Sequence, residues 1–461
     1  MNKSLRAALL PALCFAIGVL LPSCGGPTLV PAPPGPTDLG PAAGLSTPPP
    51  GAVVFDLKYT VQTGRPNDIR YSSFYGYGES LAGTKTNSFL EDVRKNASRL
   101  QYVATRFKGR RWAALEYRGR RPTALYFDVN ANGKLDENER ILPTQKVNEG
   151  IEFITPDFIQ PLEDGGERLC RVLLNAYFYK GNAEPSTRWA AASLLDGAAT
   201  LEGRPARLLL YASSPGGAYD QYGESECALL LGDQTKIKAN EYIPRQRLSG
   251  LISSESRFYR LKVEGMRSNG LPARVVLVKD SSPMGTVAVK LVGSNAVQTV
   301  VRSLSVRGVE DKTVFLQLFS ANDQVSLPIG TYAVDSGRLA YGGGANSNEW
   351  EVSFLRPQNT GLFHLKSGEV TDQTLGLPTL LVQAVEERKR YDGRATGSTT
   401  IKRGTRVYLQ PRIVGKAEEV FKGFREATAT AAKGGKADRP PKITITGPDG
   451  KELLSKTMEY G

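Results

Sequence analysis

The chain is predicted to be mainly β, built from several small antiparallel β-sandwich-like domains with few short helices. Apolar and polar residues alternate with a period of two in several segments, and clusters of Gly, Pro, Asn and Asp separate those segments. The chain has 461 residues, of which 40% are hydrophobic, so we expect neither general disorder nor a polytopic membrane protein. A chain of this length accommodates roughly two to four domains.

The period of two is clearest near the start of this β-rich region. Phe55, Leu57, Tyr59 and Val61 alternate with polar residues, which predicts one strand with an apolar and a solvated face. Further strands are predicted at Ala124–Phe127, Arg207–Tyr211, Tyr259–Val263, Arg274–Val278, Thr286–Val292, Thr313–Phe319, Glu351–Leu355 and Thr405–Leu409.

Turn and helix signals complete this picture. The sequence Gly-Pro-Asp-Gly at 447–450 predicts a hairpin turn between two short apolar runs near the C-terminus. Helical signals are weaker. The period is broken over Asn87–Phe107, whereas the Ala- and Glu-rich stretch Ala417–Lys433 favours a helix more strongly.

The first residues have the pattern of an export signal. Lys3 and Arg6 precede the apolar run Ala7–Leu21, which is shorter than the roughly 20 residues that a membrane-spanning helix needs. A secretory signal peptide over residues 1–23 is therefore the better interpretation.

The sequence Leu21-Pro22-Ser23-Cys24 resembles the lipobox of bacterial lipoproteins. This resemblance implies cleavage before Cys24 and a lipid anchor on that cysteine, and Gly25 in place of Asp implies the outer membrane. The expected location is the cell envelope, either periplasmic or surface-exposed. The alternative is an ordinary secreted protein in which Cys24 has no such role.

The domain organisation follows from these shifts in composition. Residues 24–50 are rich in Pro and Gly, which predicts an extended linker. The predicted β domains are 51–150, 151–270 and 271–375, followed by an Ig-like domain at 376–461.

Two segments resemble each other. Gly119–Asp136 and Gly203–Asp220 each contain an Arg-Pro pair, an apolar strand and a Gly-containing loop that ends in Asp. Their loop aspartates are 220 − 136 = 84 residues apart, a spacing closer to one small β domain than to a solenoid repeat. They are either copies of one unit or similar by chance.

After removal of the predicted signal peptide, two cysteines remain besides Cys24. Outside the cytoplasm, Cys170 and Cys227 either form one disulfide or stay as two buried thiols. The sequence leaves both alternatives open, because it gives no distance between them.

One motif carries recognisable chemistry. The twelve residues from Asp128 to Glu139 resemble an EF-hand calcium loop, in which oxygens at positions 1, 3, 5, 7, 9 and 12 surround the ion and Gly at position 6 permits a sharp turn. The resemblance implies these ligands: Asp128, Asn130, Asn132, Lys134 through its carbonyl, Asp136 and Glu139.

The surroundings of this motif differ from those of an EF-hand. Ala124–Phe127 before the loop predicts a strand instead of a helix, so we expect Ca²⁺ to make the structure rigid and not to act as a sensor. In the second segment the equivalent positions hold Ala212, Ser214, Gly216 and Gly223, and that loop is predicted not to bind calcium.

Charge and composition limit the function further. The net charge is +13, but basic clusters such as Lys108–Arg111 are scattered and predict solvated faces, with anionic lipid or polysaccharide as conceivable partners and nucleic acid excluded. The single His364 leaves too few ligands for a zinc site. No catalytic residue is assigned.

Two hypotheses follow. The first is a non-enzymatic, lipid-anchored envelope protein with one structural calcium site, which binds cell-surface polysaccharide or protein or acts as a scaffold. The alternative is a polysaccharide hydrolase that uses paired carboxylates, because 46 acidic residues permit many pairs.

Overall fold

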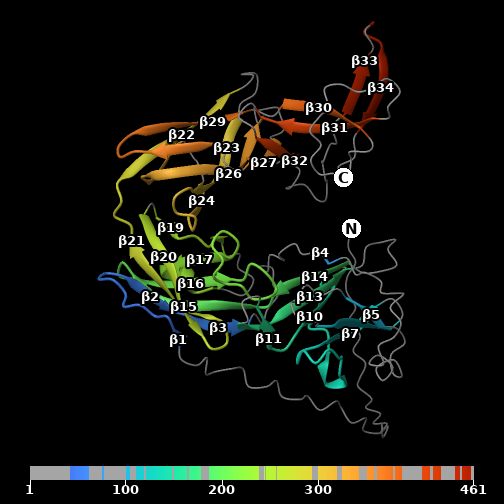
Figure 1. Ribbon diagram of the computed structural model, residues 1–461, viewed down its shortest axis with the longest axis vertical. Coiled ribbons are helices and arrows are strands. Elements are labelled where there is room, and N and C mark those ends of the chain that lie inside the picture. The colour runs from blue at the N-terminus through green and yellow to red at the C-terminus, as the bar shows by residue number, and fades with distance from the viewer. Residues whose placement is uncertain are drawn as a thin grey trace, which may run out of the picture. The chain divides into compact units, whose positions relative to one another are not determined.

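The computed structural model describes most of the chain after residue 41 (Figure 1). The described residues are 42–61, 75–76, 100–103, 111–118, 121–147, 150–162, 166–177, 186–237, 243, 245–255, 257–292, 299–318, 324–341, 350–357, 361–376, 379–386, 407–415, 419–426, 442–446 and 449–457. The predicted signal peptide 1–23, Cys24 and the linker up to residue 41 lie outside these residues.

The mainly β prediction is confirmed, since strands dominate the described chain (Figure 1). Helical structure among the described residues is limited to two short 3₁₀ turns, η2 (Glu137–Glu139) and η3 (Gly232–Thr235). With one exception, the described strand pairs are antiparallel: β22 (Met284–Val292) and β29 (Val370–Gly376) run parallel.

Sheets A and B enclose the first core. Phe55 and Leu277 from sheet A pack with Leu208 and Leu210 from sheet B, and all four side chains are almost fully buried. Sheet A has the order β1-β20-β21-β2, with β19 also paired to β20, and its strands are β1 (Ala42–Ala43), β2 (Val53–Asp56), β19 (Leu251–Ser254), β20 (Arg257–Arg267) and β21 (Pro272–Lys279). Sheet B has the order β18-β17-β16-β15-β3, and its strands are β3 (Lys58–Val61), β15 (Ser193–Leu201), β16 (Arg204–Tyr211), β17 (Glu226–Leu231) and β18 (Gln246–Arg247).

Sheets C, D and E share a second core, which contains Phe127, Phe153, Phe158 and Trp189. Sheet C has the order β4-β14-β13-β10-β9, with β4 (Tyr75–Gly76), β9 (Gln145–Val147), β10 (Gly150–Ile154), β13 (Val172–Tyr177) and β14 (Ser186–Ala191). Sheet D has the order β5-β6-β7-β8, with β5 (Leu100–Tyr102), β6 (Ala113–Arg118), β7 (Arg121–Phe127) and β8 (Arg140–Ile141). Sheet E pairs β11 (Phe158–Pro161) with β12 (Glu167–Cys170).

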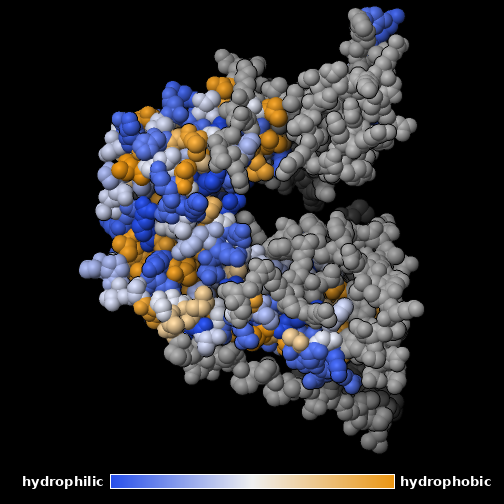
Figure 2. All heavy atoms as spheres, viewed as in Figure 1, coloured by the Kyte–Doolittle hydropathy of each residue, from blue (hydrophilic) through white to orange (hydrophobic). Residues whose placement is uncertain are grey.

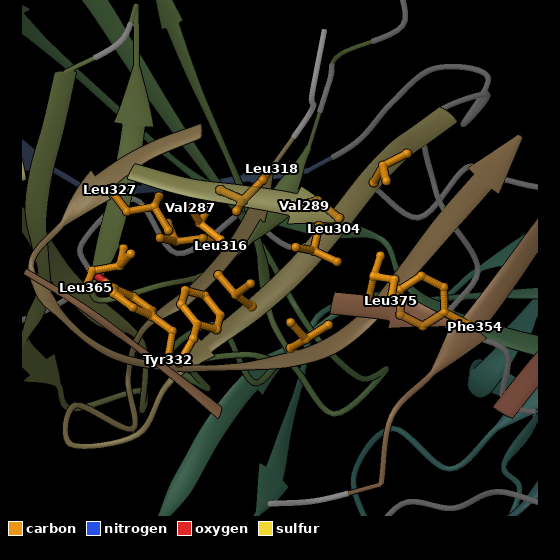
Figure 3. Packing of buried hydrophobic residues seen from close by; sticks show 14 of the residues in the cluster. Val287, Val289, Leu304, Leu316, Leu318, Leu327, Tyr332, Phe354, Leu365 and Leu375 are labelled. Atoms are coloured by element: carbon orange, nitrogen blue, oxygen red, sulfur yellow. The ribbon is translucent and has the colours of Figure 1, made fainter. Parts of the chain in front are cut away.

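Sheets F and G form the third core, where Val287 and Leu375 pack with Leu304 and Phe354 (Figure 3). Sheet F has the order β25-β22-β29, with β25 at Gln324–Pro328. Sheet G has the order β24-β23-β26-β27-β32-β31-β30, with β28 also paired to β26, and contains β23 (Thr299–Gly308), β24 (Phe315–Leu318), β26 (Gly330–Tyr341), β27 (Trp350–Leu355), β28 (Leu362–Leu365), β30 (Thr379–Glu386), β31 (Val407–Val414) and β32 (Val420–Glu426).

The C-terminal hairpin pairs β33 (Lys442–Thr446) with β34 (Glu452–Thr457). These strands flank the Gly-Pro-Asp-Gly sequence at 447–450, as the turn signal predicts. Among its residues, Asp449 and Gly450 are described, and Gly450 has a φ of 78°.

The single strand predicted over residues 55–61 is interrupted. Leu57 lies between β2 and β3, which belong to two different sheets, and its N–H donates to the Ala273 carbonyl at 2.8 Å. The alternating apolar residues are therefore divided between sheets A and B, the two sheets that enclose the first core. A period of two does not reveal this change of sheet.

The helix predicted over Ala417–Lys433 is wrong for residues 420–426, the part of this stretch that forms a described strand. Residues 420–426 form β32, which pairs with β27 and β31, and Phe421 is buried in the third core. Cross-strand pairing and burial here override the helix propensity of Ala and Glu.

Strand pairing crosses the predicted domain boundaries. β3, near the start of the predicted domain 51–150, pairs with β15 of the predicted domain 151–270, and β2 pairs with β21. β1 lies within the predicted linker 24–50 and pairs with β20. Residues 42–61 thus complete sheets formed by later parts of the chain.

Candidate metal site

The EF-hand-like loop, Asp128 to Glu139, begins where β7 ends. Phe127, the last residue of the strand, is fully buried and its ring lies 5.0 Å from that of Phe158. Asp128 is also fully buried, and its N–H donates to the Trp112 carbonyl at 2.9 Å. The strand therefore fixes the first residue of the loop.

The turn itself depends on two residues with positive φ. Gly133 has a φ of 74°, and a Cβ built there would meet no atom within 4 Å, so the backbone conformation and not space requires glycine. Ala131 also has a positive φ, 58°. The motif predicts a sharp turn at Gly133, whereas alanine at position 131 gives no indication of a positive φ.

Side-chain oxygens at positions 1, 3 and 5 accept backbone hydrogen bonds from the turn. Asp128 accepts through Oδ1 from the Asn132 N–H and through Oδ2 from the Gly133 N–H, both at 3.1 Å. Asn130 Oδ1 accepts from the Asn132 N–H at 2.9 Å, and Asn132 Oδ1 accepts from the Lys134 N–H at 2.7 Å. These bonds hold the side-chain oxygens of Asp128, Asn130 and Asn132 against the backbone of the turn.

Glu139 closes the loop from its other end. It is the last residue of η2, and its Oε2 accepts from the Asp136 N–H at 3.0 Å. Its Oε1 accepts from the N–H groups of Val129 at 2.8 Å and Asn130 at 3.3 Å. A carboxylate at position 12 therefore reaches back to the start of the loop.

The pKa of the Glu139 carboxyl reflects both its burial and its neighbours. Burial raises the pKa of Glu139 above its ordinary value, and the nearby charge of Asp128 acts in the same direction. The hydrogen bonds that Glu139 accepts from backbone N–H groups act in the opposite direction and lower its pKa. Each carboxylate has about four lone-pair positions, so both residues retain acceptor capacity for a cation beyond these hydrogen bonds.

The six predicted ligands are only partly gathered. Asp128 and Glu139 are buried together, whereas Asn130, Asn132 and Lys134 are exposed. The Asp136 carboxylate accepts instead from Asn132 Nδ2 at 3.0 Å. Among the described residues, no group of three or more His, Cys, Asp and Glu side chains is arranged to hold a metal ion.

The loop is anchored by its apolar residue and its surface is hydrophilic. Leu135, at position 8, is buried with Ala114 and Tyr126 of the two strands that precede it. Figure 2 shows hydrophilic residues over the part of the surface where Figure 1 draws this loop, after β7. One side of the loop is thus fixed to sheet D while the other faces solvent.

Arg111 is a residue of this site that the sequence analysis missed. It belongs to the basic cluster Lys108–Arg111, predicted to be a solvated face, but it is only 5% exposed. The prediction is wrong for Arg111, whose guanidinium donates to the carbonyls of Asp128 and Val129. The sequence feature that could have indicated its burial is its position just before the apolar residues of β6.

The second loop repeats the turn without the carboxylates. Gly217 has the same φ as Gly133, 74°, but a Cβ there would lie 3.0 Å from Cys170 Sγ. The one acidic residue that aligns with a ligand, Asp220, forms an ion pair with Arg168 at 3.5 Å. That this loop does not bind calcium stays a prediction.

Of the two alternatives for Cys170 and Cys227, the structure has two buried free thiols and not the disulfide. They belong to two different cores, and each Sγ faces a backbone carbonyl: that of Gly216 for Cys170 at 3.1 Å, and that of Arg247 for Cys227 at 4.0 Å. Burial raises the pKa of both thiols to about 12, which keeps them protonated at neutral pH.

A small pocket lies beside β18, β23 and β24. Its lining includes Asp335 and Arg247, which form an ion pair at 3.5 Å, and the ring of Phe315. Because Asp335 is the single carboxylate in this lining, the pocket does not supply the two acids that the hydrolase hypothesis requires.

Within the described part of the chain, no helix has the length and apolar character needed to span a membrane. Comparisons with protein-family models, with curated proteins and with solved structures found no match to this chain. The functional interpretation therefore rests on the residues and geometry given above.

Proposed function

We propose that this protein is a lipid-anchored component of a bacterial cell envelope, whose β domains carry one structural calcium site and serve in binding or scaffolding. The observation that carries the calcium part is the convergence of the buried carboxylates of Asp128 and Glu139 from opposite ends of one loop. The anchor part is supported by the lipobox-like sequence at residues 21–24.

The loop has the charge and ligand types that calcium favours. Ca²⁺ takes six to eight oxygen ligands from carboxylates, amides, carbonyls and water. Asp128 and Glu139 would supply the inner carboxylates, Asn130 and Asn132 the amide oxygens, and Lys134 its carbonyl. Asp136 would join directly or through water, once its carboxylate turns away from Asn132 Nδ2.

The expected role of the ion is structural. The loop connects two neighbouring strands of sheet D, β7 and β8, through the short turn η2, so no pair of long helices is available to open. A cation between Asp128 and Glu139 would offset their mutual repulsion, which contributes to the raised pKa of Glu139. Calcium would thereby hold the two ends of the loop together.

Thermal unfolding with and without a chelator tests the calcium proposal. Saturating calcium at about 100 times its Kd would stabilise the wild type by about 2.7 kcal/mol. Asp128→Asn should lose most of this stabilisation, whereas the matched control Asp220→Asn in the second loop should keep it. A wild-type Tm that does not respond to calcium would refute the proposal.

Lipid labelling tests the anchor. Expression in a Gram-negative host with labelled palmitate should give a labelled, membrane-associated protein, and Cys24→Ser should give an unlabelled product that is released on cell lysis. Labelling that persists in Cys24→Ser would contradict the proposed anchor.

A polysaccharide panel tests the binding role against the hydrolase alternative. Assay of the full chain against a broad panel of polysaccharides, followed by end-group analysis, would establish it if cleavage products formed. Retention of a polysaccharide without cleavage would support the binding role.

A further inference from the structure

We propose that Arg111 is a positioning residue that couples occupancy of the calcium loop to the order of the neighbouring β11–β12 hairpin. This inference rests on the proposed calcium site and adds a structural consequence of ion binding. Arg111 lies two residues before the start of β6 and is 5% exposed, although its charge favours solvent.

The guanidinium of Arg111 joins two segments through their backbone. Its Nη1 donates to the Asp128 carbonyl at 2.6 Å and to the Val129 carbonyl at 2.7 Å, which are positions 1 and 2 of the loop. Its Nη2 donates to the carbonyl of Ile159 in β11. One rigid group therefore holds the start of the loop and the middle of β11 in a fixed relation.

Aromatic contacts support this bridge. The Arg111 guanidinium lies over the Phe158 ring, 4.8 Å from its centre, and that ring packs against Phe127 at 5.0 Å. Because Phe127 directly precedes Asp128, the same two segments are joined twice, once by hydrogen bonds and once by packing. A planar guanidinium can donate in several directions while it stacks on a ring, which a lysine ammonium does not reproduce.

Through Arg111, calcium binding to the loop would also affect the order of β11. Calcium would hold the side chain of Asp128, while Arg111 holds the carbonyl of the same residue. Ordering of the loop is therefore transmitted across Arg111 to the Ile159 carbonyl, and by reciprocity an ordered hairpin favours ion binding. Burial lowers the pKa of Arg111, and the charges of Asp128 and Glu139 act in the opposite direction.

Hydrogen–deuterium exchange of the full chain, read by mass spectrometry with and without calcium, tests this inference. In the wild type, calcium should slow exchange several-fold both in the loop and in β11 and β12. In Arg111→Lys, which keeps the charge, calcium should still slow exchange in the loop, while the effect on the hairpin should fall by more than half.

The matched control is Arg207→Lys. The Arg207 guanidinium also donates hydrogen bonds, but its partner is the carboxylate of Asp196 within sheet B, away from the calcium loop. It should leave both calcium effects as in the wild type. If Arg111→Lys does not show the wild-type β circular dichroism, Phe158→Leu provides a second variant, which removes the ring beneath the guanidinium and should reduce the calcium effect on β11.

The outcomes separate this inference from the proposed function. If calcium binds but the hairpin responds equally in wild type and Arg111→Lys, or does not respond in the wild type, Arg111 does not couple the two segments. If calorimetry shows that the wild type binds no calcium, the calcium proposal fails and the coupling fails with it.

Discussion

The loops that follow β7 and β16 have a similar turn but satisfy it with different groups. Gly133 and Gly217 share a φ of 74°. In the first loop the Gly133 N–H donates to the Asp128 carboxylate, whereas in the second the Gly217 N–H donates to the Ser214 carbonyl, both at 3.1 Å. The turn can therefore form with charged or with neutral acceptors.

The second loop is completed by groups that need no counterion. Ser225 Oγ accepts from the Gln221 N–H at 3.2 Å and donates to the Ala218 carbonyl at 3.1 Å. Gly217 packs against the Cys170 thiol. In the first loop, the two buried carboxylates of Asp128 and Glu139 accept backbone N–H groups instead. The difference teaches that the path of the backbone does not by itself require a cation, and the calcium proposal therefore depends on the buried carboxylates of Asp128 and Glu139.

The largest effect is expected for Asp128→Ala. The N–H groups of Asn132 and Gly133 would lose their carboxylate acceptor, and the free energy of unfolding should fall on the order of 2–4 kcal/mol, with loss of any calcium response. Asp220→Ala breaks only a partly exposed ion pair and should cost less than about 1 kcal/mol. Chemical denaturation of both variants measures the contrast, and equal losses would show that the two loops do not differ as described.

An intermediate effect is expected for alanine at the two glycines. Gly133→Ala should cost about 1–2 kcal/mol, because the positive φ is strained but space is open. Gly217→Ala should cost about 1 kcal/mol more, because the new Cβ would lie 3.0 Å from Cys170 Sγ.

Thermal unfolding measures the two alanine variants, and Cys170→Ala in the Gly217→Ala background should recover part of the loss. Equal costs for the two substitutions without recovery would contradict the packing difference.

A smaller effect concerns pH in the absence of calcium. Because the folded state raises the pKa of Glu139, its contribution to stability is full below the ordinary carboxyl pKa and is lost as pH rises through the raised value. The stability of the wild type relative to Glu139→Gln should therefore decline as pH rises from about 4 towards neutrality.

Saturating calcium should reverse this trend, because the ion binds the ionised form and competes with the proton. Denaturation across this pH range, with and without calcium, checks both statements. A wild-type advantage that grows with pH in calcium-free buffer would contradict them.

The smallest effect is expected for Lys134→Ala. The exposed Lys134 would contribute to the site through its backbone, and its N–H bond to Asn132 Oδ1 does not depend on the side chain. Calcium affinity should stay within about threefold of the wild type, with a small increase because one positive charge is removed. Titration calorimetry would show a larger change if the side chain took part.

Local sequence patterns predicted much of the fold. Alternating, β-branched or aromatic runs located β7, β16 and β20, and the spacing of oxygen-bearing residues located the loop from Asp128 to Glu139. These features depend on neighbouring residues only. For the same reason, the position of Gly133 within that spacing is enough to identify it as a turn residue.

The remaining features depend on contacts between distant segments. Leu57 divides one alternating run between two sheets, β32 forms because Phe421 enters a core, and Arg111 is buried because it meets the carbonyls of a loop and of β11. The orientation of Asp136 towards Asn132 is likewise a matter of side-chain geometry. Composition and spacing contain no information about these partners.

Isothermal titration of the purified chain with calcium, in chelator-treated buffer, measures the loop directly. We expect one calcium ion per chain, no binding in Asp128→Asn, and unchanged binding in Asp220→Asn. Absence of binding to the wild type, or undiminished binding after Asp128→Asn, would contradict the assignment of this loop as a calcium site.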